Sequence, residues 1–202
     1  HTGGKQGTQV SRAVGKSVSL QQLNGASREE FVSALRPLFN NETWPLELAW
    51  ESRPFGDVNE LRAAIQVAVL TADDSRRAAL IHDYPAMDEL LLADADEAAT
   101  ISADRGSLGL TDLDDVQTER ITELSAAYRE RFDMPFVAYL DTNDTVDRVI
   151  DAGVRRLANS PEQENRTVLG EIVEIANDRF DILLADANPV RSSWDRKFTE
   201  VD

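Results

Sequence analysis

The stretch DLDDVQTERITELSAAYRERFDMPFVAYL, residues 112–140, decides how this chain folds. Within residues 114–132 apolar side chains recur at nearly every third or fourth position, which places them on one face of a helix. The members of this stripe are Ile121, Leu124, Tyr128 and Phe132. Glu123 and Glu130 fall on the other faces, so the pattern predicts an amphipathic helix that packs against a core.

The residues that follow, Met134 to Leu140, form an apolar run with a proline at its second position. Pro135 cannot continue the helix, so the pattern predicts a short, buried, extended segment. Extended backbone inside a helical protein has N–H and C=O groups that need partners. Two kinds of partner are possible for these backbone groups. One is a bound ligand, and the other is packing under neighbouring helices whose side chains or water satisfy the loop.

Length and composition indicate a single domain. The chain has 202 residues, of which 42% are hydrophobic, and it has no cysteine. This is enough chain for a substantial core, and disulfides and thiolate catalysis are excluded. No run approaches the roughly 20 apolar residues that span a bilayer, and residues 1–7 lack the apolar centre of a signal peptide. We therefore expect a cytoplasmic protein with no membrane partner.

The charge balance is strongly acidic. Acidic residues outnumber basic ones by 37 to 21, for a formal net charge of −16, and the only lysines are Lys5, Lys16 and Lys197. Molar salt would screen the self-repulsion of such a surface, so we expect a halophilic source. The same charge argues against a nucleic-acid partner, because phosphate contacts need a basic face.

Helix-start signals divide the rest of the chain into short amphipathic helices. Ser27 with Glu30 forms a capping box, and Ser160 with Gln163 forms another around a proline at the first helical position. The predicted helices cover about residues 28–39 (ended or tightened at Pro37), 44–51, 58–69, 75–83, 114–132, 146–157 and 161–183, with one or two turns near 87–92. No hairpin signal, repeat or glycine-rich phosphate loop is present. The prediction is an all-α fold, a single compact domain of about seven to nine short helices.

The predicted domain covers residues 19–186. Residues 1–18 carry no apolar periodicity and are expected to be a disordered or tag-derived tail, and residues 187–202 a peripheral polar tail. Inside the domain, residues 93–111 are acidic, alanine-rich and interrupted by glycine. A long irregular stretch in a compact domain is often functional.

Short motifs occur along the chain in a particular order. They are SLQQLN at residues 19–24, Trp44, RPF at 53–55, GL at 109–110, LSAAYRERFDMPFV at 124–137, RLAN at 156–159 and EIVEIANDR at 171–179. In order and spacing they resemble the 2-oxo-4-hydroxy-4-carboxy-5-ureidoimidazoline (OHCU) decarboxylases of urate breakdown. The longest motif resembles the family pattern L-N-x-x-Y-x-x-(K/R)-F-G-F-P-F-V.

The resemblance implies a fold and an activity. The implied fold is all-α and usually a homodimer. The implied reaction is the decarboxylation of OHCU, a small anionic substrate, to (S)-allantoin, and it needs no cofactor or metal. The sequence independently lacks a His/Asp/Glu cluster with the spacing of metal ligands.

The resemblance also implies site residues. The family has a catalytic histidine in an H-P-x-L motif. Aligned without gaps, Tyr84 stands at that histidine and Pro85 at its proline. The catalytic glutamate of the family falls on Asp104, the glutamine after it on Arg105, and the substrate-holding arginine on Arg179. Three of these positions, 84, 104 and 105, therefore depart from the family pattern.

The proton-transfer residue has two candidates. A two-residue slip that loops out Asp83 and Tyr84 would bring His82 into the site, although a lone histidine at a helix end is more often a solvated or capping residue. Tyr84 in direct register could donate a hydrogen bond, but its ordinary pKa near 10 makes it a poor base. It could equally be a core residue. Asp104 could be one more solvated surface carboxylate.

In the implied site, Arg179 orients the substrate anion and the backbone N–H groups of Phe136, Val137 and Ala138 hold the polar edge of its ring. A structural ion pair is the alternative role for Arg179. Asp104 and either His82 or Tyr84 handle proton transfer. A different function is also open: a catalytically inactive or re-purposed homologue that binds another small ligand or a pathway partner protein.

Overall fold

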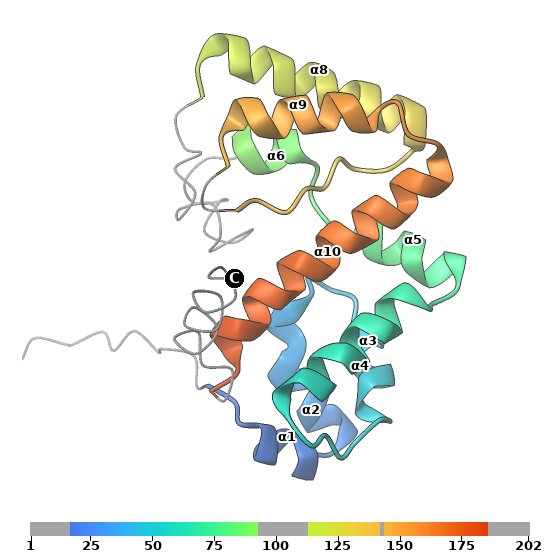
Figure 1. The fold of residues 1–202 in the computed structure, drawn as a ribbon, viewed down its shortest axis with the longest axis vertical. Helices are drawn as coiled ribbons and strands as arrows, with labels where there is room; N and C mark the ends of the chain where they lie inside the picture. Colours follow the sequence, from blue (N-terminus) through green and yellow to red (C-terminus); the bar gives the residue numbers. More distant parts are fainter. Residues whose placement is uncertain (1–16, 93–112, 142–143, 186–202) are drawn as a thin grey trace, which may run out of the picture.

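The computed structural model describes residues 17–92, 113–141 and 144–185, which form helices and connecting loops (Figure 1). The helices are α1 (Leu20–Gly25), α2 (Arg28–Leu35), the 3-10 helix η1 (Arg36–Leu38), α3 (Trp44–Trp50), α4 (Val58–Leu70), α5 (Asp74–His82), α6 (Met87–Leu92), α8 (Asp115–Phe132), α9 (Val146–Arg156) and α10 (Pro161–Leu183). Within these ranges the only β pairing is an isolated bridge between Val18 and Leu184. The predicted all-α class is confirmed.

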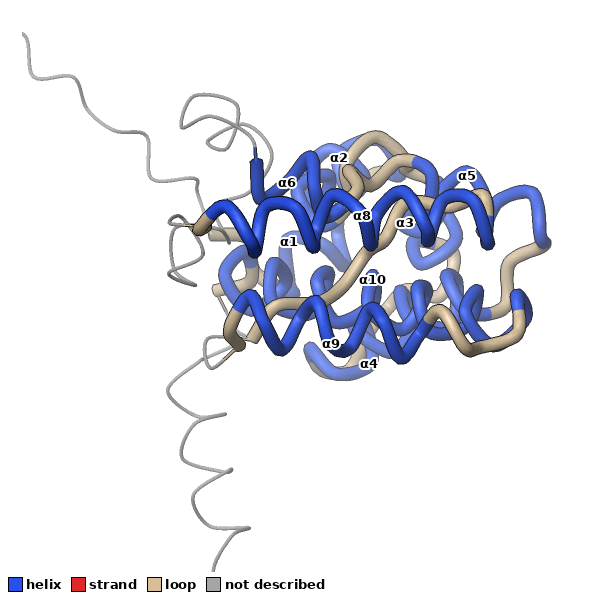
Figure 2. Tube along the Cα trace, turned by 90° about the horizontal axis from the view of Figure 1, so that it is seen from above, coloured by secondary structure: helices blue, strands red, loops and turns tan. Residues whose placement is uncertain are grey.

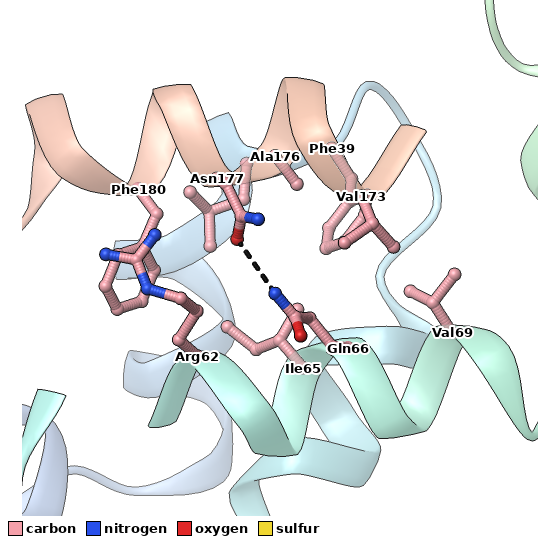
Figure 3. A pocket seen from close by; sticks show the side chains of 10 residues that line it. Phe39, Arg62, Ile65, Gln66, Val69, Val173, Ala176, Asn177 and Phe180 are labelled. Carbon is pink, nitrogen blue, oxygen red and sulfur yellow. Dashed lines mark hydrogen bonds between the residues drawn. The ribbon is translucent and has the colours of Figure 1, made fainter. Parts of the chain in front are cut away.

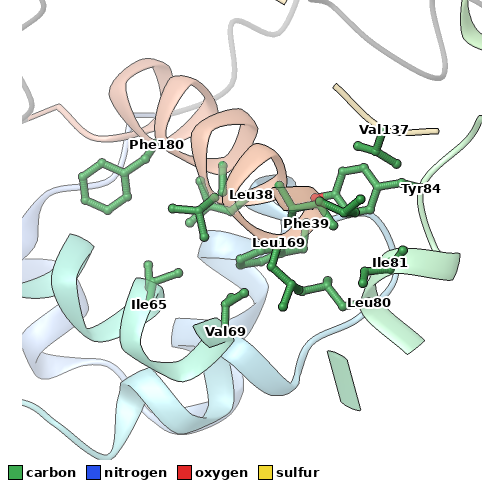
Figure 4. Close-up of a cluster of buried hydrophobic side chains, with 14 of the residues drawn as sticks. Leu38, Phe39, Ile65, Val69, Leu80, Ile81, Tyr84, Val137, Leu169 and Phe180 are labelled. Carbon is green, nitrogen blue, oxygen red and sulfur yellow. The ribbon is translucent and has the colours of Figure 1, made fainter. Parts of the chain in front are cut away.

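Helix α10 is the axis of the molecule. It runs diagonally between a group formed by α1 to α4 and a group formed by α6, α8 and α9 (Figure 1), and it packs directly on α4, α5 and η1. Helices α8 and α9 lie side by side, as the view in Figure 2 also shows. Apolar side chains from α4, η1 and α5 gather beneath α10 (Figure 4), among them Leu38, Ile65 and Leu80. Both groups of helices therefore share the core that α10 covers.

The predicted helix starts are confirmed where a capping signal stands in the sequence. Ser27 and Ser160 each accept a hydrogen bond from the backbone N–H three residues on, and the Glu30 and Gln163 side chains return the bond. Helix α1 is the one that the prediction missed. Its capping box, Ser19 with Gln22, is visible in the sequence, but six residues are too few for an apolar period to show.

The RPF motif anchors α1. The Arg53 guanidinium lies 4.2 Å from the centre of the Trp50 ring and donates to the carbonyl oxygens of Asn24 (3.1 Å) and Ala26. The Asn24 side chain in turn binds the backbone N–H and C=O of Phe55, at 2.8 and 2.9 Å. These contacts hold a helix too short to be stable alone.

Helix α8 ends where the sequence predicts. Asp133 caps it with φ 52°, in the left-handed region, and stands at the glycine of the family pattern. Aspartate tolerates this conformation better than most residues. Residues 134–140 then carry no helix or strand, which confirms that the helix stops before Pro135.

Several predictions fall on residues outside the described ranges. These are the N-terminal tail up to residue 16, the tail 187–202 and residues 93–111 of the irregular stretch. Val18, which the prediction assigned to the tail, donates to the Leu183 carbonyl at 3.1 Å. The boundaries at 19 and 186 stay predictions. In the described part of the chain, no helix is long and apolar enough to cross a membrane.

Candidate active site

The corner between α5 and α6 carries Tyr84. Its backbone N–H donates to the Ile81 carbonyl at 3.2 Å, which continues the turn at the end of α5. The side chain is 6% exposed, and Figure 4 shows its hydroxyl directed toward α10. In the described part of the structure this hydroxyl has no hydrogen-bond partner. A buried, unpaired hydroxyl is costly, so the site favours a polar ligand at this point.

Burial raises the pKa of Tyr84 to about 12. The positive charge of Arg179 opposes the rise, and the carboxylate of Asp83 adds to it. The hydroxyl therefore stays protonated throughout the neutral range and can donate a hydrogen bond or a proton. It cannot act as a base at neutral pH.

His82 is the last residue of α5, and its side chain is exposed. The slip that would bring it inward requires Asp83 to loop out. In the structure the Asp83 carboxylate accepts from the N–H groups of Asn41 (2.6 Å) and Glu42 (3.2 Å) and from the Asn41 side chain (2.7 Å). These bonds hold Asp83 in place, so the corner keeps the alignment without gaps. His82 and Tyr84 are not brought together.

Arg179 lies on α10 and faces this corner. Its Nη1 donates to the Leu38 carbonyl at 3.3 Å and to the Asn40 side-chain oxygen at 3.2 Å. Asn40 also donates to the carbonyl of Asp83, the residue before Tyr84, at 3.1 Å, and the positive charge of Arg179 lowers the pKa of Tyr84 against the rise caused by burial. Asp178, the residue before Arg179, accepts from the Tyr139 hydroxyl at 2.7 Å. The structure thus brings Arg179 and Tyr84 together.

The loop 134–140 forms the other side of the site. The carbonyl of Phe136 accepts from the Met87 N–H at 3.0 Å, and that of Val137 accepts from Arg156 at 2.9 Å. The Tyr139 N–H donates to Glu171 at 3.1 Å. Among the described residues, no group accepts from the N–H groups of Phe136, Val137 or Ala138. This loop is therefore anchored mainly through its carbonyls and retains free donors.

A buried charged network anchors the loop, and no functional role was predicted for its members. Glu164 is fully buried; its Oε1 accepts from Tyr128 and from Arg156 Nε, both at 2.6 Å, and its Oε2 accepts from Asn159 at 2.9 Å. Arg156 also lies 4.8 Å from the Phe136 ring. In the sequence, Arg156, Asn159 and Glu164 belong to the RLAN motif and the acidic residues after it. That motif was used only to recognise the family resemblance and did not predict the buried network.

The remaining predicted site residues are placed as follows. Pro85 is partly buried in the α5–α6 corner, next to Tyr84. Asp104 and Arg105 lie outside the described residues. In the ranges that the structure describes, no group of three or more His, Asp or Glu side chains could hold a metal ion.

A separate small cavity lies between α4 and α10 (Figure 3). Its volume of about 10 Å³ is that of a single water, and the Gln66 and Asn177 side chains meet in it at 3.3 Å. Arg62 and Phe180 close one end. It is too small for a substrate.

The fold is helical, and its α5–α6 corner carries a buried tyrosine hydroxyl and, through Asn40, a link to the Arg179 guanidinium. The model of the family described as OHCU decarboxylase matches residues 24–181. The chain therefore belongs to the OHCU decarboxylase family.

Individual relatives agree with this assignment. A decarboxylase of this name from Haloferax volcanii is 37% identical over 165 residues, which cover 81% of this chain and 94% of the relative. The Mus musculus decarboxylase is 32% identical over 181 residues, which cover 86% and 98%. A crystal structure of (S)-allantoin synthase, 22% identical, matches with a TM-score of 0.64 over 83% of this chain and 54% of that chain. This chain thus spans about half of the solved one, and the two share the fold.

Proposed function

We propose that this protein decarboxylates OHCU to (S)-allantoin without a cofactor, as a carboxy-lyase of urate breakdown. Membership of the family supports the reaction. The observation that carries the residue assignment is the buried Tyr84 hydroxyl, which has no partner among the described residues and lies within the electrostatic reach of Arg179.

Substrate binding uses the guanidinium that Asn40 links to the α5–α6 corner. Arg179 binds a carboxylate or ureido oxygen of the substrate with its planar fork, which a point charge could not orient as well. The N–H groups of Phe136, Val137 and Ala138 bind the polar edge of the ring, as preorganised donors do in an oxyanion site. A net charge of −16 makes such a local positive group necessary for an anionic substrate.

The reaction then breaks one carbon–carbon bond. The bond between the ring carbon and the carboxylate breaks, CO₂ leaves, and the electron pair stays on the ring as an enolate-like anion. The Tyr84 hydroxyl donates its proton from one face to the neighbouring, ureido-bearing carbon, which sets the chirality of the product. The ring hydroxyl gives its proton to the ring nitrogen and becomes the carbonyl. The tyrosinate regains a proton from solvent. A pKa near 12 suits this role, because the group arrives protonated.

Asp104 completes the proposed site. We propose that it takes part in the proton transfer with Tyr84, and that Arg105 and Pro85 contact the substrate. His82 is the alternative donor that the assay below tests.

The test is a decarboxylase assay in concentrated KCl, with OHCU made in place from urate by the two upstream enzymes. The optical activity of the allantoin is followed. We expect rapid formation of one enantiomer. We expect Tyr84→Phe to lower kcat by about 10² to 10⁴-fold, the range of a positioned acid, and His82→Ala to leave it unchanged. Loss with His82→Ala alone would reassign the donor, and no acceleration over spontaneous decay would refute the decarboxylase.

We also propose the domain bounds, the oligomeric state and the cellular location of the protein. The domain covers residues 19–186 and works as a homodimer in the cytoplasm of a halophile; the excess of acidic residues and the scarcity of lysine support the last point. Light scattering during gel filtration tests the dimer. Unfolding measured at rising KCl tests the salt requirement, and full stability in dilute buffer would contradict it.

A further inference from the structure

Asn40 lies in the connection between η1 and α3, and both ends of its side-chain amide are engaged. Its Oδ1 accepts from Arg179 Nη1 at 3.2 Å, and its Nδ2 donates to the backbone carbonyl of Asp83 at 3.1 Å. A donor on one side and an acceptor on the other fix which way the amide faces. One side chain thus joins α10 to the α5–α6 corner.

The corner that receives this bond is itself fixed. The Asp83 carboxylate binds the backbone N–H groups of Asn41 and Glu42 and the Asn41 side chain. Tyr84 is the next residue. The segment 40–42 and the corner that carries the Tyr84 hydroxyl are therefore one clamped unit, and Asn40 is its contact with the guanidinium.

A second acceptor of Arg179 lies two residues before Asn40. The Leu38 carbonyl lies 3.3 Å from Nη1, at the end of η1. Both acceptors bind the same nitrogen, so together they set the direction in which the rest of the guanidinium fork points. An arginine has many rotamers, and a fork that must bind an anion in one orientation needs such contacts.

We propose that Asn40 is a positioning residue of the decarboxylase site: its amide couples the Arg179 guanidinium to the corner that carries Tyr84, and so fixes the distance between the anion-binding group and the proton donor. This rests on the proposed function. Asn40 acts through Arg179 and is not itself a catalytic residue.

The first experiment compares two adjacent asparagines. Asn40→Ala removes one of the two acceptors described for Arg179 Nη1, and we expect KM to rise about tenfold, the loss of one hydrogen bond to a charged group. We expect kcat to change less than threefold, because Asp83 still holds Tyr84 through Asn41 and Glu42. Asn41→Ala removes a bond to Asp83 but none to Arg179, so its KM should stay within twofold of the original protein.

Two further variants separate positioning from general structure. Asn40→Asp keeps an acceptor oxygen for Arg179 but loses the donor to Asp83, so it uncouples the guanidinium from the corner and we expect KM to rise. On an Arg179→Lys background, Asn40→Ala should raise KM less than twofold further, because the group that it positions is gone. Equal rises of KM in Asn40→Ala and Asn41→Ala, or full additivity with Arg179→Lys, would overturn the inference.

A readout independent of activity keeps this inference separate from the proposed function. In ¹⁵N-labelled protein the guanidinium signal of Arg179 is assigned by its loss in Arg179→Lys. We expect restrained, resolved Nη signals that average in Asn40→Ala and persist in Asn41→Ala. If the unmodified protein has no decarboxylase activity, the proposed function fails, and the NMR comparison alone decides whether Asn40 holds Arg179. Unchanged Nη signals in Asn40→Ala would overturn the coupling.

Discussion

The two sides of the candidate site are held by opposite means. The loop 134–140 is anchored by a charged network inside the protein, in which Glu164 is 0% and Arg156 9% exposed. The α5–α6 corner is anchored by Asp83, whose carboxylate bonds with segment 40–42 are exposed or only partly buried. Both anchors are carboxylates that accept three hydrogen bonds.

The contrast shows how one type of group can serve two purposes. Water can take over the donors that Asp83 releases, because that site is at the surface. No water reaches Glu164, and removing it leaves Arg156 as a buried, uncompensated charge. The loop should therefore be held more rigidly than the corner.

The largest expected effect is at the buried anchor. Glu164→Ala should lower the free energy of unfolding by about 3 to 5 kcal/mol, the usual result of breaking a buried ion pair. It leaves Arg156 and the hydroxyl of Tyr128 without their shared acceptor, which lies 2.6 Å from each. Urea denaturation in concentrated KCl measures the difference.

The control for this variant is on the same turn of α10. Glu162 is exposed, and Glu162→Ala should change the free energy of unfolding by no more than about 0.5 kcal/mol. Equal losses in the two variants would mean that net charge, rather than the buried network, decides stability here.

A second test of the fixed loop uses Gly153 on α9. A Cβ at this position would lie 2.5 Å from a methyl carbon of Leu124 and 2.8 Å from the Phe136 ring. Gly153→Ala should therefore lower the free energy of unfolding by about 1 to 3 kcal/mol through overpacking. It should also displace Phe136, and so lower kcat/KM, in the decarboxylase assay.

Gly170 on α10 is the matched control. A Cβ there meets nothing within 4 Å, so Gly170→Ala should raise the free energy of unfolding by about 0.5 to 1 kcal/mol through helix propensity. If both alanines stabilise the protein, α9 can move away from α8 and the loop is not rigidly packed.

The exposed anchor should give a smaller effect. Asp83→Ala removes three acceptor contacts, but water replaces them, so we expect a loss of about 1 to 2 kcal/mol. Thermal unfolding compared with Glu164→Ala measures the contrast directly. A loss as large as that of Glu164→Ala would show that the two anchors do not differ, and the corner is as fixed as the loop.

Local signals explain what the sequence could predict. The helix starts at Ser27 and Ser160 are coded by residues three apart, and the end of α8 by a proline two residues beyond Asp133. The family resemblance also rests on local motifs, and the comparisons confirm it. Helix α1 was missed because its apolar residues are too few to show a period.

Contacts across the chain explain what the sequence could not predict. Arg156 and Val137 are 19 residues apart, and Asn40 and Arg179 are 139 apart. Helical spacing places Glu164, but not Glu162, on the apolar face of α10 four residues before Val168, yet it does not identify the distant partners of this carboxylate. The burial of Tyr84 and the exposure of His82 are likewise set by how α5 packs, so the sequence alone left both open as proton donors.

The smallest expected effect concerns Glu171, which binds the Tyr139 N–H of the loop. Burial raises the pKa of this carboxyl above its ordinary 4.5; the bond from Tyr139 and the charge of Arg156 oppose the rise, and Glu174 and Glu164 add to it. The folded protein therefore holds this proton more tightly than the unfolded chain does. The stability that Glu171 contributes is present below pH 4.5 and is lost as the pH rises through the folded pKa.

Glu171→Gln should remove this dependence and keep the bond, because the amide oxygen can still accept from the Tyr139 N–H. The stability of the variant relative to the original protein should increase as the pH rises from below 4.5 to neutrality, and then level off. Urea unfolding at a series of pH values measures this difference, with Glu162→Gln as the exposed control. A difference that falls with pH would mean that the ionised carboxylate is favoured in the fold. The loop would then be held by charge at this point too, as it is at Glu164.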